Sequence, residues 1–394
     1  MFYSWTEINL NALRDNIAAV RKEISPNCQI LLPLKANAYG HGLEAIAKAA
    51  YEFGVDWLGL ATLREALEIK AYVPEARILL LGPTDPDDVK ALYVHKITPI
   101  IVDLQNALEM NDAARRLRVP IPVHLKIDTG MGRIGFNSEH NIEDIYKATQ
   151  LSNLEIEGLM THFATADEDD IQYAIGQHDR FKRIIKFLKD KDVEIPLKHI
   201  SNSGGFLNIS HSDYDMVRPG ILLYGGYSGT CGNYRNSIVT EPLLSWKTNV
   251  TFIKEIFPGQ SIGYGGDYKA PAHTKIATIE VGYGDGFRRC LAGKAQVLIR
   301  GRRCPVVGRI SMDQVTVDIC LDSDIMVGDE VVLLGKQLDE EITVFELAEH
   351  MNTISYEVFT SISARVERRY IFNGEQIHNF VFSNFALMAQ SILH

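Results

Sequence analysis

The sequence is poor in the features that mark secreted, zinc-binding and membrane proteins. It has five cysteines, no two of them in a CxxC spacing, so we expect neither a disulfide framework nor a metal site. No run reaches the roughly 18 apolar residues of an ordinary transmembrane helix. The start, Met1-Phe-Tyr-Ser-Trp5, lacks the basic and apolar segments of a secretory signal. These absences predict a protein of the reducing cytoplasm that contacts no membrane.

An excess of positive charge is also missing, since the formal net charge is −10. A general nucleic-acid surface needs a basic face, so we expect no nucleic-acid partner. Any anionic ligand must instead be held by a few local cations or by N–H groups at helix starts. The hydrophobic content of 46% is ordinary for a globular protein.

With 394 residues the chain is longer than one hydrophobic core usually supports, so two domains are expected. From about residue 29 to 225, short apolar runs alternate with amphipathic stretches such as 43–53, 63–72 and 167–189. Apolar strands separated by helices are typical of parallel strands that are covered on the outside. About eight such units predict an α/β fold, a (β/α)8 barrel. The predicted strands are 29–34, 57–61, 77–82, 98–102, 123–128, 155–161, 198–201 and 221–224.

After about residue 235 the pattern changes to short β segments joined by Gly, Pro and Asp turns. One clear helix is expected in this part, at about 344–350. We therefore predict a barrel domain over residues 1–235 and a mostly-β C-terminal domain over 236–394. The predicted β segments of the second domain are 246–256, 275–281, 296–299, 314–319 and 330–334.

The stretch from Leu31 to Gly42 is the first indication of chemistry. Its apolar run predicts a buried strand that ends on Lys35, and two glycines follow before a helix. A lysine in such a place must be paired, kept neutral or covalently engaged. It can form a Schiff base with an aldehyde such as pyridoxal phosphate. Taken alone, the same lysine also fits a strand end whose charged group extends into solvent.

Polar groups follow several of the predicted barrel strands. Ligands of such barrels bind at the carboxyl ends of the strands, so one pocket is expected to collect these groups. They are Lys35-Ala-Asn, Lys126-Ile-Asp-Thr-Gly, His162-Phe, Ser201-Asn-Ser-Gly and Arg218-Pro-Gly.

Taken together, these segments resemble the alanine racemases, pyridoxal-phosphate-dependent enzymes of fold type III. The resemblance covers nearly the whole chain, from Trp5 to Val366. The motifs that carry it are Leu34-Lys35-Ala-Asn-Ala-Tyr39-Gly-His-Gly, Lys126-Ile-Asp-Thr-Gly-Met-Gly-Arg133-Ile-Gly, His162-Phe-Ala-Thr-Ala-Asp167, Asn202-Ser203, Val217-Arg218-Pro-Gly220-Ile221, Gly263-Tyr264-Gly, Gly282-Tyr283-Gly-Asp-Gly and Gly308-Arg309-Ile-Ser-Met312-Asp313.

The resemblance implies an architecture and a reaction. It implies that a first strand, at about residues 6–11, joins the β domain, and that a head-to-tail homodimer completes each active site with loops of the partner. The implied reaction interconverts L-alanine and D-alanine, and the D-alanine supplies peptidoglycan synthesis. Two bases on opposite faces of the cofactor are needed to remove and return the α-proton. Lys35, which also binds the cofactor, is implied for the D-face and Tyr264 of the partner for the L-face.

The resemblance also assigns the groups that bind pyridoxal phosphate. Arg218 is implied to face the pyridine nitrogen, and a guanidinium cannot accept a hydrogen bond from a protonated nitrogen there. That nitrogen should stay unprotonated, which makes the ring a weaker electron sink. His162 is expected beside the ring and Tyr264, next to Asn202. The phosphate is assigned to Tyr39, Ser203, Tyr356 and the N–H groups of Gly220 and Ile221.

The amino-acid substrate is assigned to Arg133 and Met312 together with Tyr283 and Asp313. Lys126 matches a lysine that is carbamylated in many family members, and a plain lysine is the alternative. Three further residues match the corridor by which substrate reaches the site, with solvated surface charge as the alternative; they are Asp167, Arg289 and Arg309.

Some positions depart from the common family pattern. Gly263 stands where a serine usually precedes the tyrosine, and Gly204 and Gly205 replace two alanines. Smaller residues are expected to loosen the pocket, so a serine racemase or one of broader specificity is the alternative function. A fold-type III decarboxylase and a pyridoxal-phosphate carrier protein are further alternatives. Arg218 and Tyr264 argue against the decarboxylase, and the β domain argues against the carrier.

Overall fold

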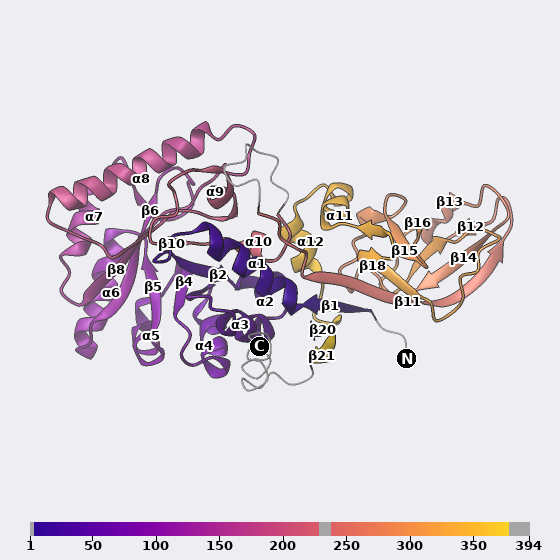
Figure 1. Ribbon diagram of the computed structural model, residues 1–394, viewed down its shortest axis with the longest axis horizontal. Coiled ribbons are helices and arrows are strands. Elements are labelled where there is room, and N and C mark those ends of the chain that lie inside the picture. The colour runs from indigo at the N-terminus through magenta and orange to yellow at the C-terminus, as the bar shows by residue number, and fades with distance from the viewer. Residues whose placement is uncertain (1–3, 228–237, 378–394) are drawn as a thin grey trace.

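The protein is described by a computed structural model over residues 4–227 and 238–377. A helix-covered barrel and a strand-rich domain lie side by side along the long axis of the molecule (Figure 1). The predicted boundary between residues 235 and 236 lies outside the described residues. Within the described ranges, no helix combines the length and the apolarity needed to cross a bilayer.

The N-terminal domain is a barrel of eight parallel strands in the order β10-β2-β3-β4-β5-β6-β8-β9. The two ends of this sheet are linked by the Asp215 N–H, which donates to the Lys198 carbonyl (3.1 Å), and by the Arg218 N–H, which donates to the Ser201 carbonyl (2.8 Å). The strands are β2 (Gln29–Pro33), β3 (Trp57–Leu60), β4 (Ile78–Pro83), β5 (Ile97–Ile101), β6 (Ile121–Asp128), β8 (Leu154–Met160), β9 (Leu197–His199) and β10 (Met216–Val217).

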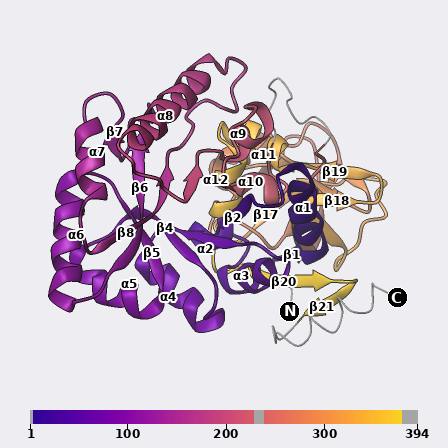
Figure 2. The ribbon, with the colours of Figure 1, turned by 60° about the vertical axis from the view of Figure 1, so that its left-hand side comes forward.

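Helices cover the outside of this barrel, and Figure 2 shows α4 to α8 around the strands. Each helix turns an apolar stripe toward the strands, as the sequence pattern predicts. A capping box starts α4, where the Thr62 hydroxyl accepts from the Glu65 N–H and the Glu65 carboxylate accepts from the Thr62 N–H. The helices are α1 (Leu10–Glu23), α3 (Leu43–Glu52), α4 (Leu63–Tyr72), α5 (Val89–His95), α6 (Leu104–Leu117), α7 (Ile142–Thr149) and α8 (Gln172–Asp190).

One predicted barrel strand is wrong. Residues 221–224 do not form a strand, because Gly220–Leu223 is the short helix α10 and the eighth strand is β10, just before Arg218. A short buried apolar run does not distinguish a strand from a helix. Pro219 lacks an N–H and favours the start of a helix over the interior of a sheet.

The C-terminal domain is a ten-stranded sheet whose middle closes on itself, because the long β11 pairs with both β14 and β18. The predicted strands of this domain are confirmed to within three residues, whereas β16, β19, β20 and β21 were not predicted. The one helix expected here is α11 (Val344–Met351), and Ser355–Ser361 is a second helix that was not expected. The strands of the sheet are β11 (Leu244–Ile256), β14 (Thr274–Ile279), β15 (Gln296–Ile299), β16 (Arg302–Val307), β17 (Val315–Asp318), β18 (Glu330–Gln337), β19 (Glu340–Ile342), β20 (Glu367–Phe372) and β21 (Glu375–Ile377), with β1 (Trp5–Asn9) from the chain start.

The two domains are joined through β1 and helix α12 (Ser355–Ser361). β1 pairs with β11 and β20 before the chain enters α1 and the barrel. The residue after the barrel's first turn, Gly40, packs against the carbonyl of Phe359 in α12. The Arg368 side chain of β20 donates to the Gly40 carbonyl (3.2 Å). The carboxyl end of the barrel is therefore fixed against the C-terminal domain.

Candidate active site

Polar side chains from several strands and loops converge on one cavity of about 230 Å³ at the carboxyl ends of the barrel strands. This is where ligands of such barrels bind. Its lining contains no Asp or Glu among the described residues. Ten residues predicted from the sequence line it, namely Lys35, Tyr39, Lys126, Arg133, His162, Asn202, Ser203, Arg218, Gly220 and Tyr356.

Lys35 begins a single turn, α2 (Lys35–Tyr39), that has the left-handed rather than the right-handed helical conformation. Ala36, Asn37 and Ala38 have φ values of 54°, 57° and 52°. Left-handed backbone costs roughly 1–2 kcal/mol per residue for ordinary amino acids, and such strain is concentrated at functional sites. The sequence pattern predicted the break after Lys35 but not this geometry.

Hydrogen bonds with residues outside the turn hold it in place. The Glu65 carboxylate accepts from the Ala36 N–H (3.0 Å), and the Asn37 side chain accepts from the Leu43 N–H (2.8 Å). His41 Nδ1 lies 2.9 Å from the Tyr39 carbonyl, which identifies it as the donor nitrogen. The turn therefore directs Lys35 and Tyr39 into the same cavity.

The amine of Lys35 is half-buried, and its environment favours the neutral form. Burial lowers the pKa of Lys35, and the positive charge of Arg133 lowers it further. A lowered pKa makes this amine available as a nucleophile or a base near neutral pH.

Arg218 lies buried at the base of the cavity and is held by uncharged acceptors. It donates to the carbonyls of Thr161 (2.7 Å) and Ile200 (3.0 Å) and to His199 Nδ1 (2.8 Å). His162 Nδ1 lies 3.3 Å from the same guanidinium. Burial lowers the pKa of Arg218 to about 9, which still leaves a cation at neutral pH.

Burial and nearby positive charge favour the neutral forms of the neighbours of Arg218. Burial lowers the pKa of His162 well below its usual value, and Lys126 and Arg218 lower it further. Burial also lowers the pKa of Lys126 far from its usual value, and the charges of Arg218 and Arg133 add to this. His162 Nε2 lies 3.4 Å from the Asn202 side chain, so Asn202 is a further neighbour of this histidine.

Hydroxyl and N–H groups gather at the start of α10. The Ser203 hydroxyl accepts from the Leu222 N–H (3.2 Å). A Cβ atom added at Gly220 would lie 3.1 Å from the Tyr39 hydroxyl, so the helix start lies close against this side chain. The Tyr356 ring of α12 packs edge-on against Tyr39, with 5.6 Å between the ring centroids. The Gly220 N–H itself donates to the Arg218 carbonyl (2.9 Å).

A second group of predicted residues lies outside this cavity, on the C-terminal domain. Tyr264, Met312 and Tyr283 expose 70%, 52% and 38% of their surface. The Tyr283 N–H donates to the Ser311 carbonyl (3.0 Å), which joins the loops of Tyr283 and Met312. Tyr264 belongs to the turn η2 (Tyr264–Gly266), between β12 (Ser261–Ile262) and β13 (Tyr268–Lys269).

The same exposed surface carries three of the charged residues predicted from the sequence. Arg309 forms a two-pronged ion pair with Asp267 (2.5 and 2.6 Å) across the turn that bears Tyr264. Asp313 pairs with Arg365 (2.7 Å). Arg289 is exposed in η3 (Arg289–Leu291), whereas Asp167 is exposed on the barrel, close enough to raise the pKa of Tyr356.

The expectation that Gly204 and Gly205 loosen the pocket is not supported by their surroundings. A Cβ atom at Gly204 would lie 2.9 Å from the backbone of Ala166 and Asp167. One at Gly205 would lie 2.5 Å from the ring of Phe163. The barrel loop 163–167 fills the space that larger side chains would take at the start of α9 (Ser203–Asn208).

His199 and His124, which were not predicted as site residues, extend the contacts of Arg218. His199 Nε2 lies 2.8 Å from His124 Nδ1, and both rings are fully buried. The alternation of side chains along β6 could have indicated His124, because His124 and Lys126 are two residues apart and therefore face the same side of the strand.

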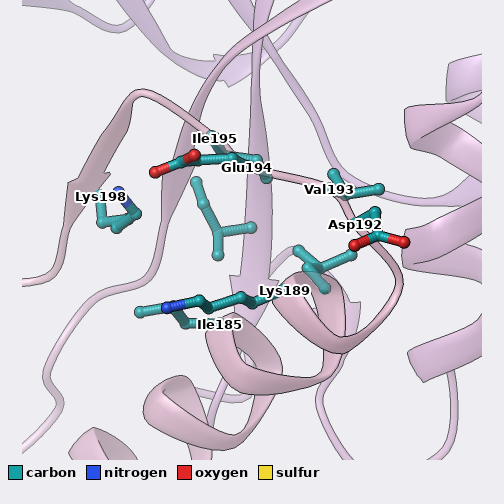
Figure 3. Close-up of a pocket in the computed structure, with 9 residues that line it drawn as sticks. Ile185, Lys189, Asp192, Val193, Glu194, Ile195 and Lys198 are labelled. Carbon is teal, nitrogen blue, oxygen red and sulfur yellow. The ribbon is translucent and has the colours of Figure 1, made fainter.

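A larger cavity of about 430 Å³ lies between the carboxyl-terminal half of α8 and strands β8 and β9 (Figure 3). Its floor is aliphatic, with Leu159 and Ile185, and its charged residues include Lys198, which lies 3.5 Å from Asp215. None of the residues predicted for the site lines it. In the part of the chain that the structure describes, no cluster of three potential metal ligands occurs either.

Comparison with known proteins gives one consistent result. Residues 8–228 match the family model "Alanine racemase, N-terminal domain", and residues 243–370 match "Alanine racemase, C-terminal domain". The alanine racemase of Halothermothrix orenii is 40% identical over 367 residues, which cover 93% of this chain and 96% of that protein.

Solved structures agree with the sequence matches. An alanine racemase of Clostridium difficile 630 is 37% identical with a TM-score of 0.89, covering 95% of this chain and 97% of that one. An alanine racemase from Bartonella henselae with covalently bound pyridoxal phosphate is 27% identical with a TM-score of 0.84, covering 94% and 99%.

Proposed function

Because this chain belongs to the alanine racemase family, a family of isomerases, we propose that it interconverts L-alanine and D-alanine with pyridoxal 5′-phosphate as cofactor. The observation that carries the proposal is the single cavity lined by Lys35, Arg133, His162 and Arg218. Peptidoglycan synthesis is the proposed consumer of the D-alanine, by family resemblance alone. The serine alternative is not favoured, because barrel atoms fill the space beside Gly204 and Gly205.

The residues present fit the cofactor. Lys35 Nζ, with its lowered pKa, would bind the aldehyde carbon. Tyr39, Ser203, Tyr356 and the N–H of Ile221 would hold the phosphate, since hydroxyls and amides at a loop-to-helix start suit an anion. The Gly220 N–H was also assigned to the phosphate, but it already donates to the Arg218 carbonyl. When bound, pyridoxal phosphate supplies an electron sink that acidifies the α-proton of an amino acid.

Two residues are proposed to move the proton. Lys35 Nζ would take or return it on the D-face, and the Tyr264 hydroxyl of the partner subunit on the L-face. A phenol with a pKa near 10 is a weak base at neutral pH, so it needs a cationic or hydrogen-bonding neighbour. His162, between Asn202 and Arg218, is proposed as the residue that links Tyr264 to the Arg218 charge.

Arg218 is proposed to face the pyridine nitrogen of the cofactor. The guanidinium has only donors, so it cannot accept a hydrogen bond from a protonated ring nitrogen and would instead donate one to the unprotonated form. Its fixed contacts to Thr161, Ile200 and His199 supply the rigidity that such a role needs. A decarboxylase of this fold type would present a carboxylate instead, and the described lining of the cavity has none.

Arg133 is proposed to bind the substrate carboxylate together with the N–H of Met312, with Tyr283 and Asp313 beside them. The lowered pKa of the buried Lys126 amine supports its carbamylation, because the neutral amine nitrogen bonds to the carbon of carbon dioxide and releases a proton. The resulting anion would pair with Arg133. Unmodified electron density at Lys126 would refute the modification. Asp167, Arg289 and Arg309 are proposed to line the corridor to the site.

A head-to-tail homodimer is proposed because the chain divides its site residues between two surfaces. Lys35 lines the barrel cavity, whereas Tyr264 and Met312 are exposed on the other domain. Exposed apolar and aromatic side chains on one face are typical of an interface. In such a dimer, the exposed loops of one subunit would cover the barrel cavity of the other.

The proposed function is tested by exchange of the α-hydrogen of alanine in deuterium oxide. The purified protein, supplied with pyridoxal phosphate, should exchange this hydrogen starting from either enantiomer and should produce the opposite enantiomer. Running the same assay with L-serine measures the breadth of the reaction. Exchange without production of the opposite enantiomer would contradict a racemase.

A further inference from the structure

A chain of polar side chains crosses the interior of the barrel from Arg218 to the opposite end. Arg218 contacts His199, and His199 contacts His124, each at 2.8 Å. His124 Nε2 lies 3.6 Å from a carboxylate oxygen of Glu157 on β8, and Glu157 forms an ion pair with Arg77 at 2.7 Å. The histidines are fully buried, whereas the Glu157 and Arg77 side chains are 25% and 47% exposed. This series of contacting side chains therefore connects the base of the cavity to the surface.

The donor and the acceptor of each contact in this series follow from the groups at its two ends. Arg218 can only donate, so His199 Nδ1 must accept. A neutral imidazole carries one N–H, so His199 Nε2 donates to His124 Nδ1. His124 Nε2 then carries a proton that faces the Glu157 carboxylate, which can only accept when ionised. At 3.6 Å this last link is electrostatic, and no closer acceptor for the buried Nε2 occurs among the described residues.

The charges in the chain are consistent with this direction. Burial lowers the pKa of His199, and the charge of Arg218 lowers it further, so the ring is neutral. Burial lowers the pKa of His124 more strongly than Glu157 raises it. Burial alone would raise the pKa of Glu157, but contacts with His124 and Arg77 outweigh it and keep the carboxylate ionised. The series thus runs from the Arg218 cation to the Glu157 anion, with two neutral imidazole rings between them.

The residues around His124 leave space for its ring and pack against it. Gly158 is the register partner of His124 on β8, and a Cβ atom there would lie 2.5 Å from His124 Nδ1. Trp57 packs edge-on against the ring with 5.5 Å between centroids. The Arg77 guanidinium covers the other part of this indole, 3.9 Å from the Trp57 ring centroid. The contact between the histidines therefore depends on a glycine at this position.

We propose that Glu157 is a positioning residue for Arg218 and acts on it through His124 and His199. Its carboxylate reinforces, from the other end, the tautomer that Arg218 requires, in which both histidines carry the proton on Nε2 and His199 offers a bare Nδ1 to Arg218. The contact of Arg218 with His199 is thereby supported from the amino end of the barrel. The catalytic consequence rests on the proposed function, in which Arg218 faces the cofactor, but the tautomers do not.

The experiment uses the full-length protein labelled with ¹⁵N-histidine. Nitrogen shifts should show His124 and His199 in the Nε2–H form in the unmodified protein. Glu157→Leu should lose that single form at His124, whereas Glu157→Gln, which keeps an acceptor oxygen, should retain it. With alanine, Glu157→Leu should lower kcat about tenfold with little change in KM, as removal of a supporting partner typically does. Glu155→Leu, an exposed carboxylate on the same strand, is the matched control.

The outcomes separate this proposal from the proposed function. An Nδ1–H tautomer at either histidine of the unmodified protein would overturn the directional chain, even if no variant folds. Equal kcat values for Glu157→Leu and Glu155→Leu would overturn the positioning role. If the protein racemises no alanine while the tautomers respond to Glu157→Leu, the proposed function fails and the control of the histidines by Glu157 stands.

Discussion

Lys35 and Tyr264, the two residues proposed to transfer protons, do not share a cavity within one chain. Lys35 lines the cavity at the carboxyl end of the barrel, whereas Tyr264 is 70% exposed on the turn between β12 and β13 of the C-terminal domain. Figure 1 shows these strands at the far end of the molecule from the barrel. A two-base reaction with these groups therefore needs two chains.

The first prediction concerns the base on the L-face. Tyr264→Phe removes one hydroxyl and should slow removal of the L-alanine proton by about 10²–10⁴-fold, the usual contribution of a general base. Binding of pyridoxal phosphate, followed by its visible absorbance, should not change. Tyr93→Phe, at another exposed tyrosine, is the control. Full exchange from L-alanine in the Tyr264 variant would remove this residue from the mechanism.

The second prediction tests whether the two residues act across a subunit interface. Lys35→Ala and Tyr264→Phe should each be inactive as homodimers. After unfolding and refolding as an equal mixture, half of the dimers should be mixed, and one of the two sites in each should contain both native residues. The mixture should recover about a quarter of the unmodified activity, since a head-to-tail dimer shares each site between subunits. Lack of any recovery, with mixed dimers demonstrated, would mean that the residues act within one chain.

Much of the site was predictable from sequence because its residues follow strand ends. Lys35, Lys126 and His162 each lie at the end of a predicted strand or directly after it, and parallel strands bring their carboxyl ends together. The C-terminal residues were assigned through the family resemblance. The misplaced eighth strand shows the limit of this reasoning, because an apolar run such as Ile221–Leu223 has no period that separates helix from strand.

Other features depended on tertiary contacts that a linear pattern does not contain. The left-handed turn after Lys35 is held by Glu65 and His41, which lie outside it. The effect of Gly204 and Gly205 was misjudged because the atoms that fill their space belong to another loop, namely the backbone of Ala166 and Asp167 and the ring of Phe163. His124 and His199 are 75 residues apart in the sequence and come into contact only in the folded barrel.

The third prediction concerns the contact between the barrel turn and α12. A side chain at Gly40 would collide with the Phe359 carbonyl, whereas one at Gly54 would meet nothing within 4 Å. Both glycines have a left-handed φ, 82° and 81°, so alanine carries the same backbone penalty at either position. Gly40→Ala should therefore lower stability by about 1–3 kcal/mol more than Gly54→Ala, as overpacking usually does. Urea denaturation measures the difference.

The same pair of variants tests the role of α12 in cofactor binding. Displacement of α12 moves Tyr356, which lines the cavity beside Tyr39. Gly40→Ala should therefore weaken binding of pyridoxal phosphate in a fluorescence titration, and Gly54→Ala should not. Equal affinities in the two variants would show that α12 does not support the proposed phosphate site.

The fourth prediction concerns acid stability and the buried His41. Burial lowers the pKa of His41 from 6.5 to about 4, although its contacts with the Tyr39 and Ala38 carbonyls raise it in part. In the unfolded chain the ring binds a proton below about pH 6.5, while in the folded protein it stays neutral until about pH 4. The contribution of His41 to the free energy of unfolding is thus fully present above pH 6.5 and is lost as the pH falls toward 4. For this one group the loss is on the order of 3 kcal/mol.

His41→Asn isolates this contribution, because asparagine retains an N–H donor for the turn but does not titrate. Comparing urea unfolding at pH 7 and pH 5, the unmodified protein should lose more stability than the variant, approaching about 1.4 kcal/mol per pH unit for one proton. His95→Asn, at an exposed histidine, should behave like the unmodified protein. If the His41→Asn and His95→Asn variants lost equal free energy of unfolding between pH 7 and pH 5, His41 would not be the group that binds the proton on unfolding. Its ring would then not contribute to any acid sensitivity of the left-handed turn beside Lys35.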